Sequence, residues 1–266
     1  MTTTVSPAAV RAVPAAAENP LRDTWNVFVR ESRPVLRDPF SMIFSLLQPL
    51  VFLGLFGPLL IGSSGAPAGE TLTWFVPGIL AMTVLFGSGS TGANLLMEMQ
   101  TGSHERTLVA PVARSALLVG RALKEVAPTI AQAVLIVAVA LPFGFRASFA
   151  GLVAGLVLLA VFGVGLGAFS YALALASREK DWMFWAVQQS VIFPLMILSG
   201  MLLPLAEAPA WMRAAASVNP ISHIVSAERV LLAGDLFSEA ALKGFGSALL
   251  LAAAGLAVGI AAMRRH

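Results

Sequence analysis

The sequence predicts an all-α integral membrane protein with six transmembrane helices, an N-terminal interfacial helix, a short cytosolic helix and an external re-entrant hairpin. Two observations predict this class. Hydrophobic residues make up 58% of the 266 positions and charged residues only 12%, which is too apolar for an ordinary water-soluble domain. The apolar residues also form continuous runs that do not alternate with polar ones, so helices are the structures that satisfy the backbone in lipid.

The first 40 residues contain no predicted span. Residues 2–20 are rich in Ala, Thr and Pro and lack the apolar core of a signal peptide, so we expect a disordered cytosolic tail over 1–20. Over 21–38, apolar residues recur at helical spacing among four arginines, which predicts an amphipathic helix in the headgroup plane. A polar lead-in with scattered apolar residues is the alternative, and it changes none of the later inferences.

Six apolar stretches follow, and we expect residues 39–266 to form one six-span membrane domain. Each stretch holds roughly 20 residues, which as a helix crosses a hydrocarbon core of about 30 Å. The stretches are Ser41 to Ile61, Trp74 to Asn94, Val126 to Phe143, Gly151 to Ala176, Trp182 to Leu203 and Phe245 to Met263. Glycine pairs such as Gly151 with Gly155 predict close contacts between these helices.

Basic residues predict the orientation of the helices. Of the 17 Lys and Arg residues, thirteen fall on the side that holds both termini. The four on the other side are Arg146, Arg213, Arg229 and Lys243. By the positive-inside rule both termini are cytoplasmic, and the expected location is a bacterial plasma (inner) membrane. The net charge of +3 then reflects topology, and no nucleic-acid partner is expected.

The sequence offers no catalytic, metal or cofactor site. It has no cysteine, and His104, His223 and His266 are far apart in sequence and outside the predicted spans. A serine hydrolase would need a histidine inside the bundle, and a metalloprotease would need His-Glu-x-x-His, which is absent. We therefore expect no catalytic residue, no metal ligand and no cofactor bound by this chain.

The chain also lacks its own source of energy for transport. The strongest polar groups well inside the predicted spans are glutamines, which do not titrate: Gln48, Gln132, Gln188 and Gln189. No Gly-x-x-x-x-Gly-Lys-Ser/Thr segment is present to bind nucleotide phosphates. Gly87, Gly89 and Gly92 match a dinucleotide-binding pattern, but no strand precedes them, so close helix packing is the better interpretation.

A charged stretch, Glu98 to Glu125, separates the second and third apolar stretches. Gly102 and Pro111 bracket a predicted short helix with Ser103 as its N-cap, and Glu105 lies near the positive end of its dipole. A short capped helix at the membrane face transmits force better than a flexible loop. Without a supporting motif, the better interpretation of Glu105 and Arg106 is a solvated surface pair.

A second structured segment, residues 204–239, is predicted on the external side. Pro204 breaks the helix of the fifth span. Asn219 and Pro220 are a good N-cap and first-turn pair for a further helix, which Gly234 can close. We expect this hairpin to dip into the outer leaflet or to cap the bundle.

Two motifs give these segments a family resemblance. The cytosolic run Gly102-x-x-Glu105-Arg106-x-Leu108-x-x-Pro111-Val112-x-Arg114-x-x-Leu117-Leu118-x-Gly120-Arg121 resembles the signature of ABC-2 type (type-2 ABC exporter) permeases, close to the daunorubicin-resistance-like transmembrane subunits. The later run Phe193-Pro194-Leu195 to Leu198-Ser199-Gly200, followed by Leu203-Pro204, Pro209-x-Trp211, Asn219-Pro220 and Leu231-Leu232-x-Gly234, resembles the fifth span and external hairpin of the same family. With the six spans, the similarity covers nearly everything after about residue 20.

The resemblance implies a non-catalytic half-transporter. Two permease subunits, identical or related, would pair, and each would dock a separate cytosolic ATP-binding subunit that carries ATP and magnesium. The amphipathic N-terminal helix and the segment from Glu98 to Arg114 would form the contact with the ATPase. The predicted coupling residues, which define a coupling segment over 98–121, are Glu98, Gly102, Glu105, Arg106, Pro111, Arg114 and Arg121. The hairpin, with Pro204, Trp211, Asn219, Pro220 and Gly234, would line the exit. His104, Ala113 and His223 depart from the usual family pattern.

The uncharged spans favour export of a hydrophobic or amphiphilic substrate, drug-like or lipid-like, from the cytoplasm or inner leaflet. A polysaccharide-exporting ABC permease is an alternative, for which aromatic residues lining a channel would be the sign. Trp182, Phe184 and Trp185 cluster at one end of the fifth stretch, where interfacial anchoring is the commoner explanation. An ATP-independent secondary transporter or assembly factor is a further alternative. The sequence leaves the substrate, the direction of transport and homodimer or heterodimer open.

Overall fold

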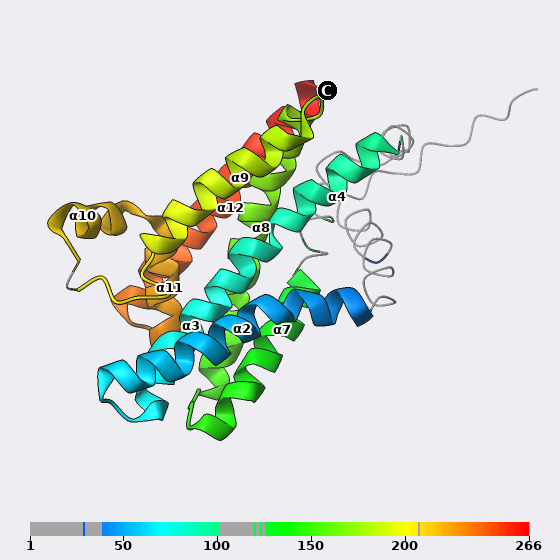
Figure 1. Ribbon diagram of the computed structural model, residues 1–266. Coiled ribbons are helices and arrows are strands. Elements are labelled where there is room, and N and C mark those ends of the chain that lie inside the picture. Colours follow the sequence, from blue (N-terminus) through cyan, green and yellow to red (C-terminus); the bar gives the residue numbers. More distant parts are fainter. Residues whose placement is uncertain are drawn as a thin grey trace, which may run out of the picture.

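Every regular element that the structure describes is a helix, as predicted (Figure 1). This computed structural model describes residues 39–101, 126–206 and 208–265, with Val29, Gly120 and Leu123 as isolated positions. Within these ranges five segments are long and apolar enough to cross a membrane. They are α2 (Pro39–Ser64), α3 with α4 (Ala68–Gly87 and Gly89–Gln100), α7 (Val126–Ala140) with the 3-10 turn η1 (Leu141–Phe143), α8 (Phe149–Ala176) and α12 (Glu239–Arg265). The predicted interfacial helix over 21–38 and the predicted helix between Gly102 and Pro111 lie outside the described residues.

Helix α3 forms the centre of the bundle. Its side chains from Phe75 to Leu85 are buried, and α2, α7, α8 and α11 (Pro220–Leu232) all pack against it. Figure 1 shows α2 crossing over α3, while α4 continues from the far end of α3. The predicted single span Trp74 to Asn94 is divided only by Ser88, a turn residue between α3 and α4 that keeps right-handed helical angles (φ −62°, ψ −22°), and the two helices together form one candidate span.

The fifth predicted span needs a correction. Its helix, α9 (Asp181–Ile197), has 17 residues and ends before Leu203. Gly200 ends the helical path with a left-handed φ of +69°, a conformation that glycine adopts without strain. The Ser199 hydroxyl donates to the Met196 carbonyl at 2.6 Å in the same turn. Helix α9 is therefore absent from the five candidate spans of the described residues, and the six-span arrangement stays a prediction.

Glycines allow α8 to approach two neighbours closely, and one of these glycines, Gly151, belongs to a glycine pair whose spacing predicted such a contact. A Cβ on Gly165 of α8 would lie 2.7 Å from the Ala252 nitrogen of α12. A Cβ on Gly151 would lie 2.7 Å from the Leu231 carbonyl carbon of α11. Both distances are shorter than real Cβ contacts, so a side chain at either position would push the helices apart.

The segment between α9 and α12 contains two helices, α10 (Ala210–Val218) and α11. Helix α10 lies at the edge of the molecule, whereas α11 is packed among α3, α8 and α12 (Figure 1). The remaining outer surfaces of α2, α9 and α12 expose large apolar side chains, as expected for helices that face lipid.

Candidate functional site

The structure describes one of the seven predicted coupling residues. Glu98 is half-buried near the end of α4. Gly102, Glu105, Arg106, Pro111, Arg114 and Arg121 lie outside the described residues. The coupling segment is therefore seen at its beginning only, where it leaves α4.

The end of α4 is joined to the start of α9. The side-chain nitrogen of Gln100, the last residue of α4, donates a hydrogen bond to a carboxylate oxygen of Asp181, the first residue of α9. The adjoining turn between α8 and α9 exposes Arg178, Glu179 and Lys180. The Gln100–Asp181 hydrogen bond connects the described beginning of the coupling segment to α9.

Asn219 joins the other end of α9 to α11. Its Oδ1 accepts a hydrogen bond from the Ile221 amide at 3.0 Å, which caps α11 as predicted, and Pro220 occupies the first turn. Its Nδ2 donates to the Leu195 carbonyl of α9, also at 3.0 Å. One side chain therefore both starts α11 and holds it to the last turn of α9.

Gly234 closes α11, also as predicted. Its φ is +99°, and the amides of Gly234 and Asp235 donate to the carbonyls of Leu231 and Val230 at 2.8 and 3.0 Å. The Ser148 amide donates to the Leu232 carbonyl at 2.9 Å and so ties this end to the start of α8. The two remaining hairpin residues of the prediction, Pro204 and Trp211, are exposed.

Arg229 holds α11 against α3 and the turn after α9. Its Nε donates to the Trp74 carbonyl at 3.0 Å and its Nη2 to the Gly200 carbonyl at 2.8 Å. The guanidinium carbon lies 4.2 Å from the centroid of a Trp74 ring, within cation–π range. Burial lowers the Arg229 pKa to about 10, so the side chain stays charged near neutral pH. Sequence reasoning used this arginine only to assign orientation and missed its three contacts.

Glu228 is the second residue of α11 that sequence reasoning missed. The side chain is 1% exposed, and neither carboxyl oxygen has a hydrogen-bond partner among the described residues. It lies against Gly155 of α8, where a Cβ would come within 2.5 Å of Oε1. Helix α11 is not a candidate span, and burial raises the Glu228 pKa to about 8, so the acid is largely neutral at pH 7. The burial of Glu228 could have been predicted from the sequence, because helical spacing places it on the apolar face of α11. That face holds Ile221, Ile224, Val225, Leu231 and Leu232.

Three of the four predicted polar groups of the spans line cavities. Gln48 and Gln132 line a cavity of about 240 Å³ between α2, α3 and α7. Gln188 lines a cavity of about 370 Å³ between α9 and the rest of the bundle, whereas Gln189 is exposed. Within the described ranges, no group of three or more His, Asp or Glu side chains is placed to hold a metal ion.

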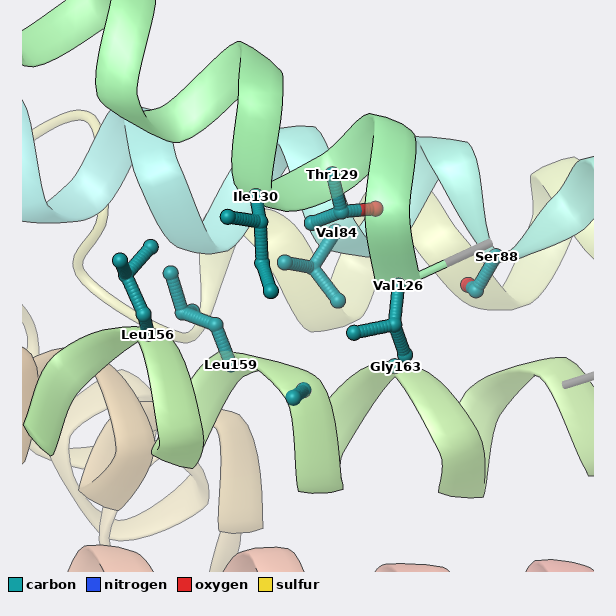
Figure 2. Close-up of a pocket in the computed structure, with 9 residues that line it drawn as sticks. Val84, Ser88, Val126, Thr129, Ile130, Leu156, Leu159 and Gly163 are labelled. Carbon is teal, nitrogen blue, oxygen red and sulfur yellow. The ribbon is translucent and has the colours of Figure 1, made fainter. Parts of the chain in front are cut away.

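A third, much smaller gap lies where α3, α7 and α8 meet (Figure 2). Val84, Ile130 and Leu159 point into it from the three helices, and its volume is about 10 Å³. That is about the space of a single water molecule. The gap marks incomplete packing next to the turn at Ser88 and is too small for a transported molecule.

Comparisons with known proteins agree with this architecture. Residues 22–232 match the family described as ABC-2 type transporter. The daunorubicin resistance ABC transporter permease protein DrrB1 of Streptomyces coeruleorubidus is 29% identical over 198 residues, which cover 74% of this chain and 70% of that protein. The putative transport permease ycf38 of Cyanophora paradoxa is 29% identical over 73% of this chain and 69% of its own length. The probable multidrug ABC transporter permease YbhR of Escherichia coli K12 is 24% identical over 61% of this chain and 44% of its own length.

Proposed function

Because the chain belongs to the ABC-2 type transporter family and is a non-catalytic, multi-pass permease subunit of that type, we propose that it forms the membrane part of an ATP-driven exporter for hydrophobic or amphiphilic, drug-like or lipid-like molecules. The subunit would lie in a bacterial plasma membrane with both termini in the cytoplasm and would pair with a second permease copy or homologue. ABC permeases pair with ATP-binding subunits, and ATP and magnesium would be held there.

One observation carries the choice of cargo. The cavity of about 370 Å³ beside α9 has no charged residue among its described lining residues, and most of its surface is apolar. A cavity of this size and character suits a molecule of drug-like size better than a small ion. The printed names of two relatives, a daunorubicin resistance permease and a probable multidrug permease, support the same class of cargo.

The described contacts suggest how movement would pass through the subunit. Closure of the paired ATP-binding subunits would displace the coupling segment, residues 98–121. The Gln100–Asp181 hydrogen bond would pass this displacement to α9, and Asn219 would pass it from the end of α9 to α11. Helices respond to such inputs as nearly rigid bodies, so the hairpin would move with α9.

Co-purification tests the proposal. The full chain, carrying a C-terminal tag, would be expressed with the products of neighbouring genes, solubilised gently and analysed for bound subunits and for ATP hydrolysis. A stoichiometric ATP-binding subunit with ATPase activity is expected. A chain that purifies alone under these conditions would instead favour an ATP-independent transporter.

Two substitutions test the coupling segment within that complex. Glu105→Ala and Arg106→Ala are each expected to abolish ATP-driven export while leaving membrane insertion intact, because charge-assisted contacts to the ATPase would be lost. Normal export by both variants would show that these residues are a solvated surface pair with no coupling role.

A further inference from the structure

The cavity beside α9 is built by four parts of the fold. Ser88 and Gly89 contribute the turn between α3 and α4, Phe169 and Leu173 come from α8, and Gln188 comes from α9. Leu251 of α12 completes the wall (helices labelled in Figure 1). Helix α9 makes far fewer contacts with the bundle than α12 does, and this loose packing leaves a space of about 370 Å³.

Among the described residues that line the cavity, one buried side-chain polar atom lacks a hydrogen-bond partner. The Ser88 hydroxyl donates to the Leu85 carbonyl at 3.0 Å. The Ser170 hydroxyl donates to the Gly89 carbonyl and accepts from the Gly92 amide, both at 3.2 Å. The Gln188 Oε1, by contrast, is buried and has no hydrogen-bond partner among the described residues. A buried acceptor left in this state is unfavourable, and a ligand that donates a hydrogen bond would relieve the cost.

Gly89 leaves room for the amide group of Gln188. A Cβ at position 89 would lie 3.1 Å from the Gln188 Cδ and 3.3 Å from its Oε1, so any larger residue would displace the amide. Gln188 is seven residues after Asp181, a rise of roughly 10 Å along α9, so the group lies in the half of the helix nearer the Gln100–Asp181 contact.

We propose that this cavity binds a neutral amphiphile, with an N–H or O–H group of the ligand donating to Gln188 Oε1 and its apolar body packed against Phe169, Leu173 and Leu251. The ligand is neutral because none of the described lining residues is charged. The inference rests on the proposed function and specifies its substrate class. It also assigns Gln188 a role that distinguishes it from its exposed neighbour Gln189.

Two probes test the hydrogen bond. The full chain in lipid nanodiscs would be titrated with N-phenyl-1-naphthylamine, a neutral fluorescent amphiphile with one N–H, and with its N-methylated derivative, which keeps the rings but has no donor. Saturable fluorescence above that of empty nanodiscs measures binding. Gln188→Leu is expected to weaken binding of the first probe about five- to tenfold and to leave binding of the second unchanged.

Matched variants separate the site from general effects. Gln189→Leu makes the same chemical change one residue away on the exposed surface and is expected to leave both affinities unchanged. Val191→Trp places a larger side chain in the cavity wall and is expected to weaken both probes. Equal binding of the donor probe by the unmodified chain and Gln188→Leu would overturn the proposal, as would equal weakening by Gln189→Leu. Absence of saturable binding would show a groove filled by lipid and would also overturn it.

The binding measurement needs no ATP-binding subunit, so the two proposals can fail separately. Gln188-dependent binding in a chain that recruits no ATPase would leave the cavity assigned and remove the exporter mechanism. If a complex exports its substrate with ATP but binds the probes independently of Gln188, the exporter function would stand and the assignment of the cavity would fail.

Discussion

Helices α12 and α9 lie against the same partner, α8, in very different ways. Glycines bring α12 and α8 into backbone contact, so that a Cβ on Gly255 would lie 3.1 Å from the Gly165 carbonyl carbon. Helix α9 touches α8 over few residues and leaves a cavity of about 370 Å³. The comparison indicates that α8 and α12 form a tightly packed scaffold and that α9 is held to it by far fewer contacts. Both ends of α9 are also tied by single side chains to the segments that would move, through Gln100 and Asn219.

The largest loss of stability is expected when a side chain is placed in the tight contact between α8 and α12. Gly255→Leu is expected to destabilise the fold by about 3 kcal/mol, because the new side chain meets the backbone of α8. Gly246→Leu on the same helix is the matched control, since a Cβ there meets nothing within 4 Å. Thermal unfolding in detergent measures both, and equal melting temperatures would refute the tight scaffold.

The buried acid of α11 should make scaffold stability depend on pH. The Glu228 pKa is about 8 in the folded protein and about 4.5 when exposed, so between these values the unfolded chain releases a proton that the folded protein keeps. The contribution of Glu228 to the free energy of unfolding is therefore fully present below pH 4.5 and is lost as pH rises through 8. A loss of about 2 kcal/mol is expected between pH 6 and pH 8.

Glu228→Gln supplies the control for this pH effect. The amide has nearly the same shape and does not ionise, so thermal unfolding of this variant is expected to change less between pH 6 and pH 8 than that of the unmodified chain. Parallel curves for the two proteins would assign the pH dependence to other groups.

Two substitutions of Asn219 can separate its capping of α11 from its hydrogen bond to α9. Asn219→Ala removes the acceptor for the Ile221 amide and the donor to Leu195, with an expected loss of about 1 kcal/mol or more. Asn219→Ser keeps a side-chain oxygen that can cap α11 and removes the donor to Leu195 without placing a charge against that carbonyl, so it should retain most of the stability but export less. If the melting temperature and ATP-driven export fall in proportion in both variants, Asn219 acts through stability alone.

The contact at the other end of α9 should matter least for stability. Gln100 and Asp181 are both exposed, and exposed polar contacts contribute about 0 to 1 kcal/mol. Gln100→Leu is therefore expected to leave the melting temperature nearly unchanged while it lowers export per ATP hydrolysed. Unchanged coupling in this variant would show that movement reaches α9 by another route.

Much of the fold follows from local sequence signals. Continuous apolar runs predicted five of the segments that the structure shows to be long and apolar enough to span a membrane. The start and end of α11 were also predictable, because the residues that cap it, Asn219, Pro220 and Gly234, act on their own neighbours in sequence.

The features that were predicted wrongly or missed have two causes: a turn hidden within an apolar run, and contacts between residues distant in sequence. The end of α9 at Ile197 is set by a turn at Ser199 and Gly200, but the apolar residues continue to Leu203 and hide it. Gln188 and Gln189 are the same type of residue. Gln188 lines a cavity only because of how α9 is placed against the turn at Ser88. The role of the coupling segment was predicted from its motif and stays a prediction, because six of its seven residues lie outside the described part.

The 17-residue length of α9 has a consequence for the surrounding lipid. Such a helix rises roughly 25 Å, about 5 Å less than an average hydrocarbon core, so a bilayer beside it must thin locally or flanking side chains must reach to the interface. The cost of this hydrophobic mismatch depends on acyl-chain length. Membrane thickness therefore acts on the same helix that carries Gln188 and connects the two ends of the subunit.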